Sequence, residues 1–110
     1  MSKSSHLLIT GATGMVGSCV LARLMASKVP CAVIARDKGA VDAVSRVDQI
    51  LRRFDEHDGI VRVRPKVMVG DINQPNLGLA EEDLKWVGTH VREILHSAAS
   101  LNFSPAASHP

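Results

Sequence analysis

A glycine-rich segment near the amino terminus constrains the fold of this 110-residue chain more than any other feature. Residues 10–17 read TGATGMVG, and they follow a short apolar run, residues 6–10, that is typical of a buried strand. Residues 14–28 then change to helical periodicity, with Val16, Val20 and Leu24 on the expected inward face, and Pro30 follows. A glycine-rich turn that leaves a strand and opens a helix indicates the start of a βαβ unit.

The rest of the chain alternates between buried strands and amphipathic helices. Residues 31–35, 66–69 and 93–96 are predicted strands, with 61–63 as a possible extension of the third strand, and residues 40–54 and 81–91 are predicted helices. Asp37 is a candidate cap for the second helix, and residues 71–80 are expected to form a loop. With right-handed crossovers, this order predicts an α/β fold, a Rossmann-like doubly wound parallel sheet that is incomplete, with about four strands and three helices.

The residue types in the glycine-rich turn suit a diphosphate. Glycine at the first position permits a tight turn, the second allows the backbone to approach a pyrophosphate, and the third allows close packing of helix on sheet. Free amides at the start of the helix then face the phosphate charge. A tight turn without a ligand is the alternative. The expected dinucleotide contacts in this segment are Gly11, Thr13, Gly14, Met15, Val16 and Gly17.

The end of the second predicted strand favours NADP(H) as the cofactor. A carboxylate at this position accepts hydrogen bonds from the ribose 2′-OH of NAD, whereas an arginine pairs with the 2′-phosphate of NADP. Arg36 directly follows the strand and Asp37 comes next. Because a carboxylate would repel a 2′-phosphate, we expect the two residues to have different roles, with Arg36 at the phosphate and Asp37 at the helix. A solvated loop charge is the alternative reading of Arg36.

Composition indicates one globular domain. Hydrophobic residues make up 45% and charged residues 22%, and the net charge of +2 gives no reason to expect binding to nucleic acid or a membrane surface. No apolar run suits a membrane span or a signal peptide, so a cytoplasmic location is expected. Cys19 and Cys31 are expected to be reduced core thiols, and no metal site is predicted. Four arginines are expected to be solvated: Arg52, Arg53, Arg62 and Arg64.

Several separated motifs carry a family resemblance. They are GDI at residues 70–72, LGL at 77–79 before a helix that contains Trp86, and HSAA at 96–99. Together with the glycine-rich turn and Arg36, they make residues 6–103 similar to the amino-terminal part of the NAD(P)-binding domain of thioester reductases and fatty acyl-CoA reductases of the male-sterility type. These proteins belong to the extended short-chain dehydrogenase/reductase superfamily. Residues 1–103 are therefore expected to be a partial NAD(P)-binding Rossmann domain, and residues 104–110 a disordered tail.

The resemblance implies further cofactor contacts. It places Asp71 at the adenine amino group, assisted by the backbone of Ile72, although a plain loop carboxylate is the alternative. It places Arg46 beside Arg36 at the 2′-phosphate, with a solvated helix charge as the alternative. It also places the small residues after the fourth strand along the cofactor towards the nicotinamide: Ser97, Ala98 and Ala99.

The resemblance implies the NADP(H)-binding portion of a reductase that converts fatty acyl-CoA or carrier-bound acyl thioesters to aldehyde or alcohol. The family's proton donor is a Tyr-x-x-x-Lys pair, and this sequence contains no tyrosine. We therefore expect no catalytic residue here and no turnover by the chain alone. The change in composition after Phe103 favours an interrupted reductase. A non-catalytic NADP(H)-binding regulatory or partner module, and a sugar-nucleotide epimerase or dehydratase, are the alternatives. The rest of a reductase or another chain is expected to cover the open sheet edge.

Overall fold

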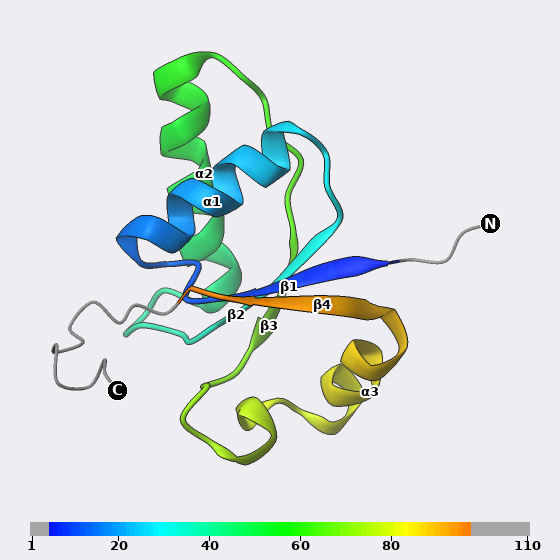
Figure 1. The fold of residues 1–110 in the computed structure, drawn as a ribbon. Helices are drawn as coiled ribbons and strands as arrows, with labels where there is room; N and C mark the ends of the chain where they lie inside the picture. The colour runs from blue at the N-terminus through cyan, green and yellow to red at the C-terminus, as the bar shows by residue number, and fades with distance from the viewer. Residues whose placement is uncertain (1–4, 98–110) are drawn as a thin grey trace, which may run out of the picture.

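The sheet is parallel and four-stranded, and helices cover both of its faces (Figure 1). The computed structural model describes residues 5–97. The strand order is β3-β2-β1-β4, and every neighbouring pair is parallel. This arrangement confirms the predicted incomplete Rossmann-like fold. The elements are β1 (His6–Thr10), α1 (Met15–Ala26), β2 (Cys31–Ala35), α2 (Ala43–Asp58), β3 (Lys66–Val69), the 3₁₀ turn η1 (Pro75–Gly78), α3 (Glu81–His90) and β4 (Val91–His96).

The register of the strands brings their carboxyl ends to one edge of the sheet. In β1, Leu8 lies opposite Ala32 of β2 on one side and Ile94 of β4 on the other. The glycine-rich turn and the loops that follow β2 and β3 all leave the sheet at this edge. In an open α/β sheet, this is the edge at which ligands bind.

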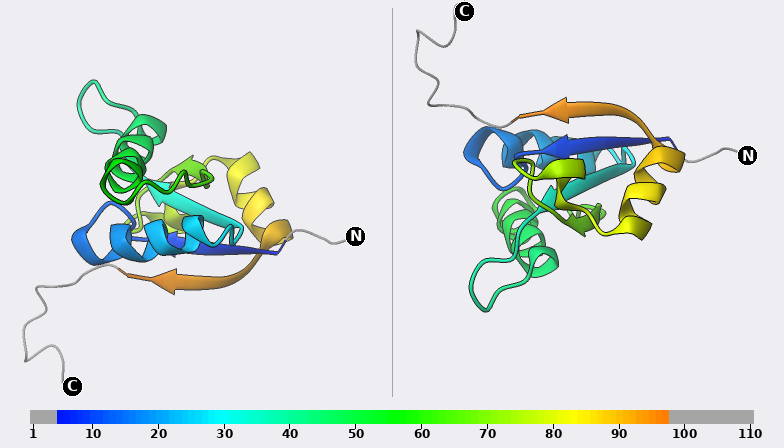
Figure 2. Two further views of the ribbon diagram at one scale, coloured as in Figure 1. Left: turned by 90° about the horizontal axis from the view of Figure 1, so that it is seen from above. Right: turned by 90° about the horizontal axis from the view of Figure 1, so that it is seen from below.

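Alternating side chains of the strands divide the core into two layers. On one face, α1 and α2 pack against the sheet through Ile9, Leu21, Val33, Val47 and Leu51. On the other face, α3 and the segment after β3 cover a second layer that includes Leu8, Ile34, Met68, Leu79 and Trp86. Figure 2 shows β4 at the outer edge of the sheet, beside β1. Within residues 5–97, no helix has both the length and the apolar character needed to cross a bilayer.

The inward face of α1 differs from the predicted one. The buried row contains Gly17, Leu21 and Met25, each one position after the predicted Val16, Val20 and Leu24. Val16 is 63% exposed, and Cys19, expected in the core, is also exposed. The physical reason is that Gly17 must face the sheet, which turns its neighbours towards the side of α1 that is left open. Cys31 is buried as expected, and burial raises the pKa of its thiol to about 11.

The ends of α2 also differ from the prediction. Its cap is Asp42, which accepts a hydrogen bond from the Ser45 N–H, while the predicted cap Asp37 accepts one from the Ala43 N–H at 2.8 Å. The helix starts at Ala43 and continues to Asp58, beyond Phe54, the last apolar residue of the predicted pattern, and Gly59 ends it with φ of 76°. Residues 60–65 form no strand, so the predicted extension of β3 is wrong.

Arg62 is buried, which corrects the expectation that it is a solvated charge. Its side chain is only 4% exposed. The guanidinium donates to the carboxylates of Asp55 and Asp58 at the end of α2 and to the carbonyl oxygen of Ala22 in α1. The hydrogen bond from Arg62 lowers the pKa of Asp58 to about 2. The sequence did not predict the burial of Arg62, because a single arginine between two valines is typical of an exposed position.

Candidate dinucleotide site

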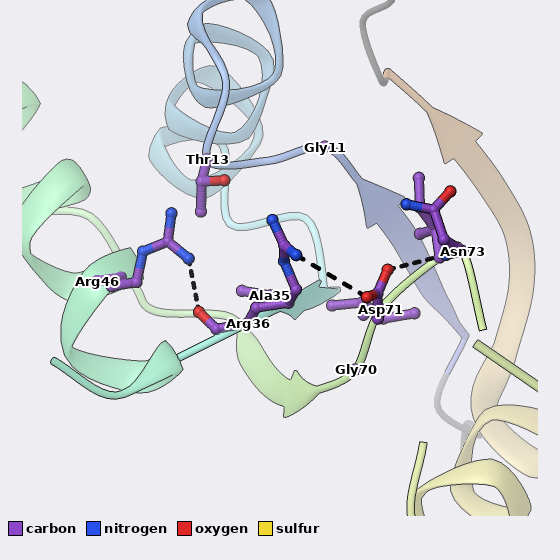
Figure 3. A pocket seen from close by; sticks show the side chains of 10 residues that line it. Gly11, Thr13, Ala35, Arg36, Arg46, Gly70, Asp71 and Asn73 are labelled. Carbon is purple, nitrogen blue, oxygen red and sulfur yellow. Dashed lines mark hydrogen bonds and ion pairs between the residues drawn. The ribbon is translucent and has the colours of Figure 1, made fainter. Parts of the chain in front are cut away.

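A hollow of about 220 Å³ lies at the carboxyl ends of β1, β2 and β3 (Figure 3). The glycine-rich turn forms one wall, the residue after β2 forms the floor, and the segment after β3 forms the opposite wall. The predicted contacts that line it are Gly11, Thr13, Arg36, Arg46, Asp71 and Ile72; the other lining residues are Ile34, Ala35, Gly70 and Asn73. The hollow therefore brings together three segments that are far apart in the sequence.

The three glycines of the turn meet different demands. Gly11 has φ of 76°, a left-handed conformation that favours glycine. A Cβ on Gly17 would lie 2.0 Å from the Gly11 carbonyl oxygen, so the close contact between turn and helix requires glycine there. A Cβ on Gly14 would meet only the Gly11 oxygen at 3.5 Å, an ordinary contact. Within residues 5–97 no close contact requires glycine at position 14, and this residue is exposed at the start of α1.

The amino end of α1 has backbone donors without partners. The N-cap residue Gly14 has no capping side chain, and the first bond into the helix runs from the Ser18 N–H to the Gly14 oxygen at 2.9 Å. Among residues 5–97, the N–H groups of Met15 and Val16 donate no hydrogen bond. By contrast, α2 has Asp42 as a side-chain cap. Exposed amides at a helix start suit the charge of a diphosphate.

Asp71 presents its carboxylate to the hollow from a loop that folds back on it. The Asn73 N–H donates to Asp71 Oδ1 at 2.9 Å, and the Asp71 N–H donates to the Leu77 oxygen at 2.8 Å. Arg36 Nη1 lies 3.9 Å from Asp71 Oδ2, and the Arg36 side chain is 71% exposed. Such an exposed pair is weak, so both groups remain available to a ligand. The carboxylate is suited to accept a hydrogen bond from the amino group of a purine.

Arg46 connects α2 to the end of β2. Its Nη1 donates a hydrogen bond to the carbonyl oxygen of Arg36. Figure 3 shows Arg36 between Arg46 and Asp71, with Thr13 above the arginines. The hollow thus has a basic side, formed by the two arginines, and an acidic side, formed by Asp71.

Ser97 lies beside the glycine-rich turn and does not line the hollow. Its N–H donates to the Thr10 oxygen at 3.0 Å, and a Cβ on Gly17 would lie 2.9 Å from its Oγ. Ser97 Oγ is buried and has no hydrogen-bond partner in the described part of the chain. Ala98 and Ala99 lie outside the described residues, so their predicted contacts remain predictions.

Sequence reasoning missed Asn73. Its N–H fixes the orientation of Asp71, and the signal that was available is the Asp-x-Asn spacing, which is typical of a side-chain turn. Within residues 5–97, no group of His, Cys, Asp and Glu side chains is arranged to hold a metal ion. The hollow, with its acidic and basic sides, and the free amides of Met15 and Val16 at the adjoining start of α1 fit the adenosine diphosphate half of a dinucleotide.

Comparison with known proteins agrees with this geometry. A family model described as male sterility protein, which models an NAD-binding domain, matches residues 9–109. Fatty acyl-CoA reductase 1 of Rattus norvegicus is 33% identical over 110 residues, covering 93% of this chain and 21% of that protein. Nonribosomal peptide synthetase 5 of Gibberella zeae is 30% identical, covering 90% of this chain and 1% of that protein.

Two solved reductase domains share the fold. The terminal R domain from the myxalamid PKS-NRPS biosynthetic pathway has a TM-score of 0.69 and 27% identity, covering 93% of this chain and 26% of that one. The PhqB reductase domain from Penicillium fellutanum has a TM-score of 0.62 and 26% identity, covering 92% and 29%. The chain thus spans only 21% of the length of the rat reductase. A nicotinamide dinucleotide is the cofactor class of the matched domain.

Proposed function

We propose that this chain, which belongs to the male sterility protein family, supplies the NADP(H)-binding portion of a reductase that acts on acyl thioesters. The relatives named fatty acyl-CoA reductase and the reductase domains of peptide-synthesis systems support this class of substrate. The acyl group is carried by coenzyme A or by a carrier domain, and the product is an aldehyde or an alcohol.

The observation that carries the choice of NADP(H) is the division of roles between Arg36 and Asp37. The Asp37 carboxylate accepts the Ala43 N–H at 2.8 Å and so belongs to the start of α2. Arg36 lines the hollow at the position where the ribose of a dinucleotide lies in this fold. A cation, with Arg46 beside it, therefore faces the ribose in place of a carboxylate, which favours a 2′-phosphate.

Bound NADPH supplies the hydride for reduction of the acyl carbonyl carbon. In this proposal the amides of Met15 and Val16 bind the diphosphate, and Asp71 accepts a hydrogen bond from the adenine amino group, assisted by the backbone of Ile72. Ser97, with Ala98 and Ala99 after it, borders the nicotinamide side. The 110 residues contain no tyrosine, so the proposal assigns no proton donor to them.

The proposal also includes a partner for the edge of the sheet. Ile94 and Leu95 in β4 are 60% and 38% exposed, and the outer edge of β4 pairs with no strand in residues 5–97. An exposed apolar edge strand favours association. We expect the rest of a reductase, or another chain, to cover it.

Titration of the chain with NADPH and NADH by calorimetry tests the cofactor assignment. We expect NADPH to bind at least about tenfold more tightly than NADH, which corresponds to about 1.4 kcal/mol. Arg36→Ala should remove most of this preference and leave NADH binding unchanged. Arg52→Ala is the matched control, because Arg52 pairs with Asp48 and does not line the hollow. Equal affinity of the unmodified chain for both cofactors would overturn the assignment.

A further inference from the structure

The helix α3 connects the two ends of the sheet and is held by few contacts. It runs from the loop after β3 back to the amino end of β4 (Figure 1). None of its residues is fully buried, whereas α1 buries four and α2 three, and its N-cap residue Ala80 provides no side-chain cap. It packs on the second core layer through Trp86 and Val87. The position of α3 therefore depends on how firmly these two side chains are held.

The loop between β3 and α3 presents Asp71 in a strained conformation. Asn76 and Leu77 have φ of 53° and 61°, in the left-handed region that is costly for residues other than glycine. The Leu77 oxygen accepts the Asp71 N–H from within this strained stretch. Strain of this kind persists only where surrounding packing holds it, and Leu77 and Leu79 pack on the same core layer as Trp86. A shift of α3 would therefore let the loop relax and would move Asp71.

Trp86 is surrounded, at the amino end of the sheet, by three groups that can carry positive charge. His6 of β1 meets the indole edge-on at 4.9 Å, and His90 stacks on it at 4.6 Å between ring centroids. Lys66, the first residue of β3, has its Nζ 5.0 Å from the centre of the ring. The indole thus joins β1, β3 and α3 at the end of the sheet opposite to Asp71.

Protonation of the two imidazoles opposes this arrangement. Among the described residues, His6 Nδ1 is buried without a hydrogen-bond partner, so a protonated ring would hold a buried N–H that has no acceptor. The charges of Lys66 and of a protonated His90 would repel it. Arg92 and Glu93 of β4, which line a hollow beside His6, carry opposite charges and offset one another. Acid therefore drives apart the elements that the indole joins.

We propose that Trp86 is a positioning residue for adenine recognition: its contacts at the amino end of the sheet hold α3, and α3 holds the loop that presents Asp71 at the carboxyl end. Protonation of His6 and His90 then weakens the recognition of adenine. The inference rests on the proposed function, in which Asp71 accepts a hydrogen bond from the adenine amino group. Trp86 does not line the hollow that contains Asp71, so its effect on binding passes through the loop.

Calorimetry with NADPH and its hypoxanthine analogue, which carries an oxygen in place of the adenine amino group, tests the positioning role. We expect the unmodified chain to bind NADPH about tenfold more tightly than the analogue, the size of one hydrogen bond to a charged group. Trp86→Leu should reduce this ratio to about twofold, and Trp86→Phe, which keeps an aromatic ring, should restore most of it. Val47→Ala, which removes packing from the first core layer, is the matched control and should keep the ratio.

A pH profile tests the same inference without replacing Trp86. We expect the ratio of the two affinities to fall between about pH 7.5 and about pH 5.5. Both ligands carry the same 2′-phosphate, so its own titration cancels in the ratio. Trp86 is the single tryptophan of the chain, and its fluorescence should change with the same midpoint. The double variant His6→Leu, His90→Leu should lose the pH dependence, whereas His57→Leu, at the exposed end of α2, should retain it.

Asp71→Ala separates failure of this inference from failure of the proposed function. If the unmodified chain does not distinguish the two ligands, or if Asp71→Ala keeps the preference, the adenine assignment in the proposed function fails and the inference falls with it. If Asp71→Ala removes the preference and Trp86→Leu keeps it, the inference alone is wrong.

Two further results overturn the inference and leave the proposed function standing. The first is a loss of the preference in Val47→Ala equal to that in Trp86→Leu, because general destabilisation would then explain both. The second is a ratio that stays constant from about pH 7.5 to about pH 5.5 in the unmodified chain. Circular dichroism under the conditions of each titration identifies any variant that is not folded, and the pH profile of the unmodified chain then decides.

Discussion

At the scale of single residues, Gly14 and Gly17 look alike in the sequence and differ in what they do. Gly17 serves the fold, because any side chain there would collide with the Gly11 backbone. A side chain on Gly14 would meet only the Gly11 oxygen, at the ordinary contact distance of 3.5 Å. The two positions therefore separate the requirement for folding from the requirement for binding.

We expect Gly14→Ala to leave the fold intact and to weaken binding of NADPH by at least about tenfold, since the added methyl group takes the space through which the diphosphate approaches. Its cost in the free energy of unfolding should stay below about 1 kcal/mol, the range for a cap position. Gly17→Ala should lower the free energy of unfolding by about 1–3 kcal/mol, as overpacking does. Urea unfolding and calorimetry measure both quantities. A Gly14→Ala variant with unchanged affinity would contradict this assignment.

Much of the candidate site could be predicted from these residue types and their spacing. The glycine-rich turn and Arg36 can be recognised because each follows a predicted strand, whereas the role of Asp71 is implied by the family resemblance. Asn73 could not be predicted, since its role depends on how the loop after β3 folds back on Asp71. Local sequence shows a charge, and only the tertiary structure shows which charges remain unpaired.

At the scale of elements, Arg62 ties α1 to the end of α2. It bonds the Ala22 oxygen at 2.8 Å in one helix and Asp55 at 3.1 Å in the other. Burial acts to raise the pKa of Asp55, but hydrogen bonds from Arg62 and Arg64 outweigh it and hold that pKa below its usual value.

Replacing Arg62 by methionine keeps the apolar part of the side chain and removes its charge. We expect the free energy of unfolding to fall by about 3 kcal/mol, because Asp55, Asp58 and the Ala22 carbonyl lose their partner in a largely buried place. Arg52→Ala, which breaks an exposed pair on the same helix, should cost less than about 1 kcal/mol. Urea unfolding followed by circular dichroism measures both. If the two variants lost a similar free energy of unfolding, the buried contacts of Arg62 would contribute no more to stability than an exposed ion pair.

The order and type of the elements were predictable because strands and helices alternate with clear periodicity and glycine or proline separates them. The exact face of α1 was not. This helix has so many apolar residues that two adjacent rows of side chains are equally suited to face the core. The close contact of Gly17 with the Gly11 backbone decides which row is buried. The rotation of α1 about its own axis is thus set more by the close contact at Gly17 than by the distribution of its apolar residues.

At the scale of the whole molecule, the two ends of the sheet differ in character. The carboxyl end holds the candidate dinucleotide site, and the amino end holds an aromatic cluster. There His6 meets Trp86 edge-on at 4.9 Å, and Trp86 stacks on His90 at 4.6 Å between ring centroids. Lys66 Nζ lies 5.0 Å from the centre of the Trp86 ring. Burial first, then the charges of His90 and Lys66, lower the pKa of His6.

This shift gives stability a definite dependence on pH. The folded protein binds a proton at His6 less readily than the unfolded chain, so unfolding takes up protons as the pH falls below the ordinary histidine value of about 6.5. We expect the free energy of unfolding to decrease from about pH 7.5 to about pH 5. His6→Leu should reduce the decrease, as measured by urea unfolding at each pH. Parallel pH profiles for the two proteins would refute the role of His6.

The parallel pairing of β1 with β4 has a consequence for how activity is assembled. Thr10 lies opposite His96 in this pairing, so both strands finish at the rim that holds the glycine-rich turn. Any strand that joins the free side of β4 in the same direction will finish at this rim too, and the loop that follows it will leave the sheet beside Ser97 and the glycine-rich turn. Chemistry carried by such a loop would be encoded in a different stretch of polypeptide from the hollow, so that either stretch could change without rebuilding the other.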